Sequence, residues 1–123
     1  MDGDLPVRLR RPAARARLAF RSGESTFYPH VDEVIWIQAR RNYSEVFVVG
    51  RSFTVREVLA SLERRLAQFG FIRVQRSSIV NLEHIVEIRR ERNRRYAVVL
   101  SDGNTIEVAS VMRERLEQLL AAD

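Results

Sequence analysis

The apolar residues of this chain follow two different spacings, and the order of these spacings limits the fold more than any other feature. Most stretches either alternate apolar and polar residues or group β-branched residues together, as strands do. Two stretches instead repeat their apolar residues every three or four positions, as a helix with one buried face does. The order is strands, a helix, strands and a second helix. This order predicts a mainly β fold with two α-helices and argues against a βαβ sheet.

The strand-like stretches account for most of the chain after residue 14. The earliest two, at residues 15–21 and 25–28, are joined by the turn residues Ser22–Glu24. The others follow the same rules of alternation and β-branched composition. They are expected at Val34–Ile37, Tyr43–Val49, Ser52–Val55, Phe71–Val74, Ile85–Ile88, Tyr96–Leu100 and Thr105–Val108.

Two segments between strands carry turn signals of different strength. Asp102 and Gly103 predict a hairpin, because this pair readily adopts left-handed turn geometry. Residues 77–82 are expected to form a turn-rich corner with Ile79 and Val80 as apolar anchors.

The two helical stretches have recognisable ends. For the first, Thr54 and Glu57 fit a capping box. An equally good interpretation lets the strand continue and starts the helix near Val58. Gly70 is expected to end this helix. The last helix is expected to begin at Ser110, since serine is a favoured N-cap residue.

The first 14 residues differ in composition from the rest. They hold Pro6, Pro12 and three arginines, which predicts a flexible basic tail or linker followed by one domain over residues 15–123. In a larger regulator, a sensory or receiver domain would be joined here. No apolar run approaches the roughly 20 residues needed to span a bilayer, and the N-terminus lacks a signal-peptide core. We therefore expect a cytoplasmic protein without a membrane partner.

Positive charge is the main compositional clue to function. The chain has 21 basic residues, all arginine, against 16 acidic residues, for a net charge of +5. A basic excess favours a polyanionic partner, either nucleic acid or an anionic membrane surface. Lysine is absent, and this alone is typical of a GC-rich coding sequence. The net positive charge needs another explanation.

The residues for catalysis are missing. There are no cysteines and only two histidines, His30 and His84, in no metal-ligand spacing. The glycines are scattered and form no phosphate-binding loop. Ser101, Asp102 and His84 are better explained as a hairpin turn and an unrelated histidine than as a triad. We expect no enzyme activity, no cofactor and no metal site.

Residues 71–88 carry the strongest functional signal. A strand here leads into a corner rich in polar side chains, including Arg73, Gln75, Arg76 and Ser77. Arginine pairs bidentately with guanine, and glutamine or asparagine with adenine. Serine suits phosphate oxygens. The corner is therefore a candidate for reading double-stranded DNA.

The same segment resembles the LytTR family of DNA-binding domains. Upstream, Val34–Tyr43 and Leu59–Leu66 look like the family's strand with its asparagine-tyrosine pair and its first helix, and Leu100–Val108 looks like its hairpin. The resemblance covers about residues 17 to 120. Within the corner segment the matching residues are Phe71, Arg73, Val74, Arg76, Ser77, Ile79, Val80, Asn81 and Ile85.

The resemblance implies an elongated fold of small antiparallel sheets with two flanking helices. Family members are response regulators of bacterial two-component systems and related transcription factors. They read direct repeats in promoters by inserting loops into the major groove. The resemblance thus implies a monomer in solution that pairs on DNA.

The resemblance also implies three groups of contact residues. The first is the loop before the second strong strand, at Arg41–Ser44. The second is the corner after Val74, and the third is the start of the last helix. Two departures stand out: Gln75 replaces a frequent histidine, and Ala109–Val111 replaces a serine-arginine-arginine run, so that Arg113 or Arg115 is expected to substitute. Asn42 and Arg76 are the main expected base contacts, Arg73 is expected to prop the fold or touch phosphate, and Asn81 to brace the corner. The predicted DNA-binding residues are Arg41, Asn42, Tyr43, Ser44, Arg73, Gln75, Arg76, Ser77, Ser110 and Arg113.

Two other interpretations stay open. The missing arginines at Ser110 and Val111 would suit a protein-interaction module that has kept the fold but lost DNA reading. RNA binding is less favoured, because no aromatic stacking motif is present.

Residues 89–95 contain five arginines in seven positions. They are expected to form a solvated hairpin tip, with contact to DNA backbone as the alternative.

Overall fold

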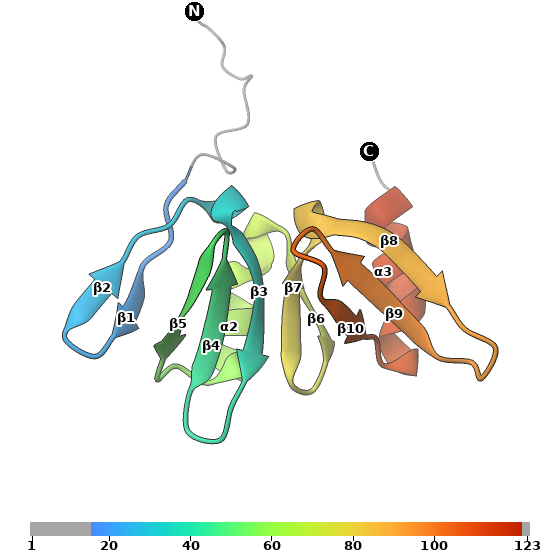
Figure 1. Cartoon of the computed structure of the whole chain (residues 1–123), viewed down its shortest axis with the longest axis horizontal. Coiled ribbons are helices and arrows are strands. Elements are labelled where there is room, and N and C mark those ends of the chain that lie inside the picture. The colour runs from blue at the N-terminus through green and yellow to red at the C-terminus, as the bar shows by residue number, and fades with distance from the viewer. Residues whose placement is uncertain (1–15, 122–123) are drawn as a thin grey trace, which may run out of the picture.

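Three antiparallel sheets stand side by side along the long axis of the computed structural model, which describes residues 16–121 (Figure 1). A hairpin of β1 (Phe20–Ser22) and β2 (Ser25–Phe27) lies at one end. The central sheet has the order β5-β4-β3-β7-β6, and the last sheet has the order β10-β9-β8. All strand pairs in these sheets are antiparallel. The bounds are β3 Val34–Ala39, β4 Ser44–Val48, β5 Arg51–Val55, β6 Phe71–Gln75, β7 Ser78–Asn81, β8 Ile85–Arg90, β9 Tyr96–Leu100 and β10 Thr105–Glu107.

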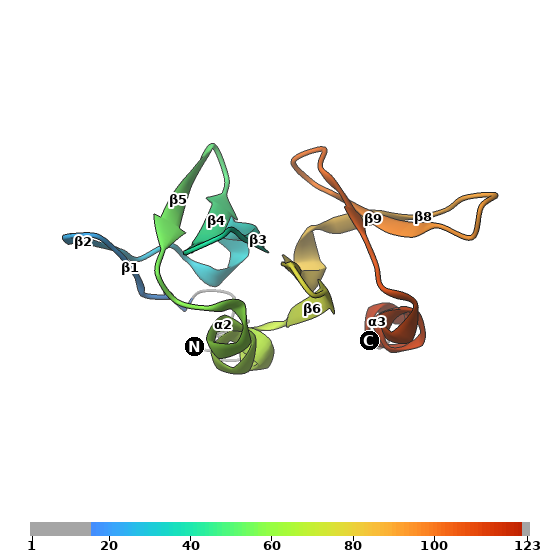
Figure 2. The same cartoon turned by 90° about the horizontal axis from the view of Figure 1, so that it is seen from below.

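Two helices complete the architecture. They are α2 (Leu59–Leu66) and α3 (Arg113–Ala121), and both lie at the bottom of the view in Figure 2, α2 near the central sheet and α3 below β8 and β9. Four single turns of 3₁₀ helix join the elements: η1 Val31–Glu33, η2 Ala67–Phe69, η3 Leu82–His84 and η4 Ser110–Met112. The predicted fold class, mainly β with two helices, is confirmed. The predicted basic tail at residues 1–14 lies outside the described residues.

The central sheet is buried on both faces because each face belongs to a different hydrophobic core. One face packs with β1 and α2 through residues such as Phe20, Leu62 and Ile79. The other packs with β9, β10 and α3 through residues such as Trp36 and Leu116. The described part of the chain is elongated because its two hydrophobic cores lie next to each other along the long axis.

Strand β3 shows how one sequence run serves both cores. Val34 and Ile37 face the core with α2, whereas Ile35 and Trp36 face the core with α3. The pairing with β4 shifts between Val34 and Trp36. Such a bulge changes which face successive side chains occupy. The uninterrupted apolar run is therefore the signature of a doubly buried strand.

The expected corner at residues 77–82 is wrong, because most of it forms β7. This strand lies between β3 and β6, and its four residues are all buried. A strand covered on both faces loses the alternation by which strands are recognised. Its polar end residue Asn81 donates from Nδ2 to the carbonyl oxygen of Val34 at 2.8 Å, and its Oδ1 accepts the Glu83 N–H at 3.0 Å. The bracing role predicted for Asn81 agrees with this geometry.

The structure decides between the two possible starts of the first helix. Thr54 stays in β5 opposite Glu45, and the N-cap residue of α2 is Val58. Glu57 does not close a capping box with Thr54, since its carboxylate accepts hydrogen bonds from Arg65 and Ser61. These bonds, that from Arg65 first, hold the pKa of Glu57 below its usual value. Gly70 ends the helical segment with a φ of 87°, as expected.

The start of the last helix differs from the prediction. The N-cap residue of the segment is Ala109, and Ser110 lies inside a 3₁₀ turn that precedes α3. The turn is closed by the backbone, because the Met112 N–H donates to the Ala109 carbonyl oxygen at 2.9 Å. A serine side chain is therefore not needed to start this helix.

Because the strands are antiparallel, their connections gather on two opposite edges of the molecule (Figure 1). The β1–β2 turn and the β8–β9 hairpin also lie on the lower side of Figure 1, and we give the name lower edge to the four connections between them. It consists of the β3–β4 loop (residues 40–43), the β5–α2 link (56–58), the β6–β7 turn (76–77) and the turn before α3 (110–112). The upper edge consists of η1, the β4–β5 turn (49–50), η3 and the β9–β10 turn (101–104).

Candidate nucleic-acid interface

Backbone hydrogen bonds join the three predicted contact segments on the lower edge. The Ala39 N–H donates to the Ser77 carbonyl oxygen at 2.8 Å, which fixes the end of β3 to the β6–β7 turn. The Ala109 N–H donates to the Val74 carbonyl oxygen at 2.8 Å, which fixes the turn before α3 to β6. Segments separated by up to 70 positions in the sequence thus form one rigid edge.

The β3–β4 loop presents its polar side chains to solvent. The Arg40 N–H donates to the Tyr43 carbonyl oxygen at 2.7 Å and closes the loop. Arg41, Asn42 and Tyr43 are exposed, Tyr43 by 42%. Within residues 16–121, the side chains of Arg41 and Asn42 form no hydrogen bond or ion pair. Two of the predicted base-reading groups are therefore available to a ligand.

Arg40 does not share this freedom. Its Nη2 and Nε lie 2.6 and 3.0 Å from Oε1 of Glu45, and the Ser52 hydroxyl donates to the other carboxylate oxygen at 2.7 Å. The hydrogen bonds from Ser52 and Arg40 lower the pKa of Glu45. The charge of Arg40 is thus balanced, and the positive charge of the loop comes from Arg41.

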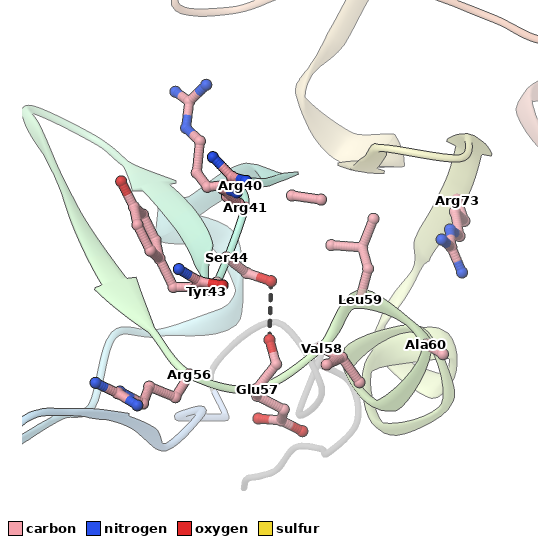
Figure 3. A pocket seen from close by; sticks show the side chains of 12 residues that line it. Arg40, Arg41, Tyr43, Ser44, Arg56, Glu57, Val58, Leu59, Ala60 and Arg73 are labelled. Carbon is pink, nitrogen blue, oxygen red and sulfur yellow. Dashed lines mark hydrogen bonds between the residues drawn. The ribbon is translucent and has the colours of Figure 1, made fainter.

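Ser44 anchors the loop from inside. It is 1% exposed, and its hydroxyl donates to the Glu57 carbonyl oxygen at 2.8 Å (Figure 3). Its side chain is therefore not presented at the surface, although the sequence grouped it with its neighbours as a contact residue. The bond fixes the β3–β4 loop to the β5–α2 link.

That link adds a residue that the sequence did not single out. Figure 3 shows the hollow between the loop and the link, lined by Arg41 and Tyr43 on one side and by Arg56, Glu57 and Val58 on the other. Arg56 is exposed, and its guanidinium has no hydrogen-bond or ion-pair partner among the described residues. A single arginine after a strand carries no sequence signal, and only the folded chain places it near Arg41.

The β6–β7 turn separates a supporting arginine from a free one. Arg73 donates from Nη2 and Nε to the Arg76 carbonyl oxygen at 2.6 and 3.2 Å, and its Nη1 lies 3.3 Å from Glu63. These contacts agree with the propping role expected for Arg73. The Arg76 side chain is exposed and unpaired within the described part of the chain. The turn is thus built so that Arg73 holds the backbone that carries Arg76.

The other polar residues of this turn are half-buried. Gln75 Nε2 lies 3.5 Å from the hydroxyl of the buried Ser78. Ser77 contributes its carbonyl oxygen to the bond from Ala39. Both remain beside Arg76, and within residues 16–121 the Gln75 side chain has only this one long hydrogen bond to lose on contact with a base.

The turn before α3 presents small and apolar side chains. Ser110 is exposed, and Val111 is 85% exposed. Arg113 points elsewhere: its guanidinium lies 5.1 Å from the ring centroid of Tyr96, and its Nε is buried. Arg115 lines a groove that also includes Glu63. Neither arginine lies within residues 110–112, where the family resemblance implies a pair of arginines.

Tyr96 holds Arg113 in this position. The Tyr96 hydroxyl donates to Glu117, which is also paired with Arg90 at 2.8 Å. Burial and then the hydrogen bond to Glu117 raise the pKa of Tyr96 to about 12. Arg113 is thus part of a packed cluster on the α3 side of the domain.

The arginine-rich hairpin between β8 and β9 is exposed throughout residues 91–95. Three of its arginines form ion pairs, Arg89 with Glu87, Arg90 with Glu117 and Arg95 with Glu107. The side chains of Arg92 and Arg94 have no ion-pair partner among residues 16–121. This geometry agrees with a solvated tip.

Ser101, Asp102 and His84 do not assemble a catalytic triad. His84 contacts the Ser101 hydroxyl at 2.5 Å and the Asp32 carbonyl oxygen at 2.7 Å. Asp102 instead accepts hydrogen bonds from Asn104. In the described residues, no group of three metal-ligating side chains is present, and no helix is long and apolar enough to cross a membrane.

A mainly β domain with unpaired arginine and asparagine side chains on hydrogen-bonded loops has the features of a nucleic-acid-binding module. The match with a known family model identifies it more closely. Residues 24–121 match the LytTr DNA-binding domain. The chain belongs to this family, as its corner segment suggested, and it is therefore a DNA-binding domain of the kind found in transcriptional regulators and not an enzyme.

Two individual proteins are similar in sequence to this chain over most of its length. The chain is 32% identical over 108 residues to the sensory transduction protein LytT of Bacillus subtilis, covering 88% of this chain and 45% of LytT. It is 36% identical over 101 residues to the CO-responsive transcriptional regulator RcoM of Rhodospirillum rubrum, covering 80% of this chain and 42% of RcoM. The chain spans less than half the length of these curated relatives.

A solved structure confirms the fold. The LytTr DNA-binding domain of a Bacillus cereus protein superimposes with a TM-score of 0.73, covering 87% of this chain and 98% of that domain, at 20% sequence identity. The predicted LytTR architecture is therefore correct.

Proposed function

We propose that this domain regulates transcription by reading promoter DNA with its lower edge. The observation that carries this proposal is the contrast on that edge between fixed backbone and free side chains. Backbone bonds at Ala39 and Ala109 hold the three contact segments, while Arg41, Asn42 and Arg76 have no partners within the described residues. Such rigid placement lowers the entropy lost when polar side chains bind.

Each free group matches a feature of duplex DNA. Arg76 suits the O6 and N7 atoms of a guanine, and Asn42 suits the N6 and N7 atoms of an adenine. Arg41 and Arg56, which flank the hollow of Figure 3, suit phosphates. The proposed contact surface also includes four neighbouring residues, Tyr43, Gln75, Ser77 and Ser110. Ser44 and Arg73 act as positioning residues, because their side chains hold the backbone.

The proposal extends to how the domain works in the cell. Two copies would bind a direct repeat, with the loops of each copy entering the major groove, and the repeat would be spaced by about one helical turn, roughly 10 base pairs. The relatives named as a sensory transduction protein and as a CO-responsive transcriptional regulator are longer than this chain, which supports a sensory or receiver domain as partner. Reading a promoter requires that the protein act in the cytoplasm, where the chromosome is.

Selection from random duplex DNA tests the proposal directly. We expect enrichment of a two-box direct repeat. Arg76→Ala should then weaken binding to the selected site by about 1–3 kcal/mol and weaken binding to random DNA far less. Arg64→Ala, which removes an exposed arginine of α2, is the charge-matched control. Equal losses on both DNAs would reassign Arg76 to a phosphate, and no enriched sequence would overturn the proposal.

One observation favours a second candidate function, a protein-interaction module. Val58 and Val111 are exposed by 67% and 85%, and no arginine stands beside Val111 at the turn before α3. This alternative predicts no salt-sensitive DNA binding and a stable complex with a protein partner instead. The same selection experiment separates the two functions.

A further inference from the structure

The turn before α3 differs chemically from the other contact segments of the lower edge. The β3–β4 loop and the β6–β7 turn each present an arginine, whereas this turn presents Val111. Val111 is 85% exposed, more than any other large hydrophobic residue in the described part of the chain. A single exposed valine is ordinary on a protein surface, so its significance depends on where it stands.

The backbone fixes Val111 in place. On one side, Ala109 is bonded to the Val74 carbonyl oxygen, one residue before the end of β6. On the other side, Met112 packs against the core that contains the fully buried Leu116. Val111 therefore stands on the same rigid edge as Arg76, and it makes no contribution to the core.

We propose that Val111 reads the 5-methyl group of a pyrimidine, thymine in ordinary DNA, at a base step next to the one that Arg76 reads. The inference rests on the proposed function, since it requires the lower edge to enter the major groove. There, guanine, adenine and cytosine present polar atoms, and only thymine adds an apolar group, its C5-methyl. Valine has no donor or acceptor, so methyl contact is the selective interaction that it can make with a base edge.

No cation stands within residues 110–112, the turn itself. Arg113 is held against Tyr96, and Arg115 lines the groove that includes Glu63. Ser110, the other exposed side chain of this turn, can bond a phosphate or any base and so contributes little discrimination. The turn before α3 should therefore specify thymine where an arginine would specify guanine.

Replacing each thymine of the selected site with deoxyuridine tests the inference, because this removes the methyl group alone. Burying one methyl contributes about 0.8 kcal/mol, which corresponds to about fourfold in affinity. We expect one thymine per half-site whose replacement weakens the wild-type protein about fourfold. Val111→Ala should bind more weakly and lose this sensitivity. At the same position, 5-methylcytosine should be preferred to cytosine, which shows that the methyl group itself is read.

Two further variants sharpen the test. Val111→Arg should change the selected base at that position from thymine to guanine. Val49→Ala, which truncates a valine that is 65% exposed on the upper edge, is the matched control and should leave the deoxyuridine profile unchanged. Specific binding with the same profile for the wild type and Val111→Ala would overturn this inference alone. Failure of the wild type to select any sequence would overturn the proposed function and this inference with it.

Discussion

The two edges of the domain differ in how many of their polar side chains are already bonded to the protein. On the upper edge, side chains satisfy the backbone: Asp102 accepts the Asn104 N–H, Glu33 accepts the His30 N–H, and His84 bonds to the Asp32 carbonyl oxygen. On the lower edge, Ser44 and Arg73 likewise bond backbone carbonyl oxygens, but the side chains of Arg41, Asn42 and Arg76 have no partner among the described residues. Connections of similar length thus serve either stability or recognition, depending on whether their polar side chains are bonded within the protein or left unpaired.

Charge follows the same division. The carboxylates beside the lower edge are paired, Glu45 with Arg40 and Glu63 with Arg73. Unpaired arginines therefore remain at residues 41, 56 and 76 of that edge. The turns of the upper edge carry Asp32, Glu33, Glu83 and Asp102. A polyanion such as DNA should approach the lower edge, because electrostatic attraction orients the encounter.

Two asparagines, one near each edge, should differ most in their effect on stability. Asn81, close to the upper edge, is fully buried and bonds to Val34, Val31 and Glu83. Asn81→Ala leaves buried groups unpaired, so we expect it to lower the free energy of unfolding by about 3 kcal/mol. Urea denaturation monitored by circular dichroism measures the loss. A change below about 0.5 kcal/mol would show that side-chain bonds on this edge are dispensable.

Asn42 on the lower edge should behave in the opposite way. Asn42→Ala removes an exposed side chain with no partner, so the free energy of unfolding should change by less than about 0.5 kcal/mol. If Asn42 reads an adenine, the Asn42→Ala protein should bind the selected DNA more weakly by about 1–3 kcal/mol. Fluorescence anisotropy with a labelled duplex measures this. An unchanged affinity would remove Asn42 from the interface.

A smaller effect is expected at Arg56, which the structure adds to the interface. Arg56→Ala should weaken binding to selected and random duplexes equally, and it should reduce the slope of log affinity against log salt by about 0.9. Titrations at several salt concentrations measure the slope. Arg64→Ala on α2 serves as control and should keep the wild-type slope. A loss confined to the selected sequence would instead assign Arg56 to a base.

The smallest expected effect is on the pH dependence of Tm, through Glu57 in the β5–α2 link that also carries Arg56. Hydrogen bonds from Arg65 and Ser61 lower the pKa of Glu57 in the folded protein. The ionised carboxylate therefore stabilises the fold above its unfolded pKa of about 4.3. This stabilisation is lost as the pH falls through the lower pKa of the folded state. Glu57→Gln should reduce Tm at pH 7 and reduce the further loss of Tm between pH 5 and pH 3. Glu24→Gln, in the exposed β1–β2 turn, should change neither. A full acid-induced loss in Glu57→Gln would contradict this role.

Local signals explain which elements were predictable. The Asp102-Gly103 turn, the end of the first helix at Gly70 and the bracing by Asn81 each depend on conformational or hydrogen-bonding preferences of a few adjacent residues. Strand β7 was missed because burial on both faces removed its alternation, and the bulge in β3 leaves no mark in an apolar run. The start of the last helix was misplaced because a backbone turn replaced the serine cap.

In the candidate interface, too, some features follow from local sequence and others only from the tertiary structure. The sequence by itself determined the family, the mainly β fold class and the segments that carry Asn42 and Arg76, because motifs and periodicity are properties of neighbouring residues. Only the tertiary structure decided which side chains in those segments are free. Ser44 and Arg73 are occupied by partners 13 and 10 positions away, whereas Arg56 and Val111 are exposed on the edge that folding creates. Availability for binding depends on contacts between distant residues, and those contacts form only when the strands have paired.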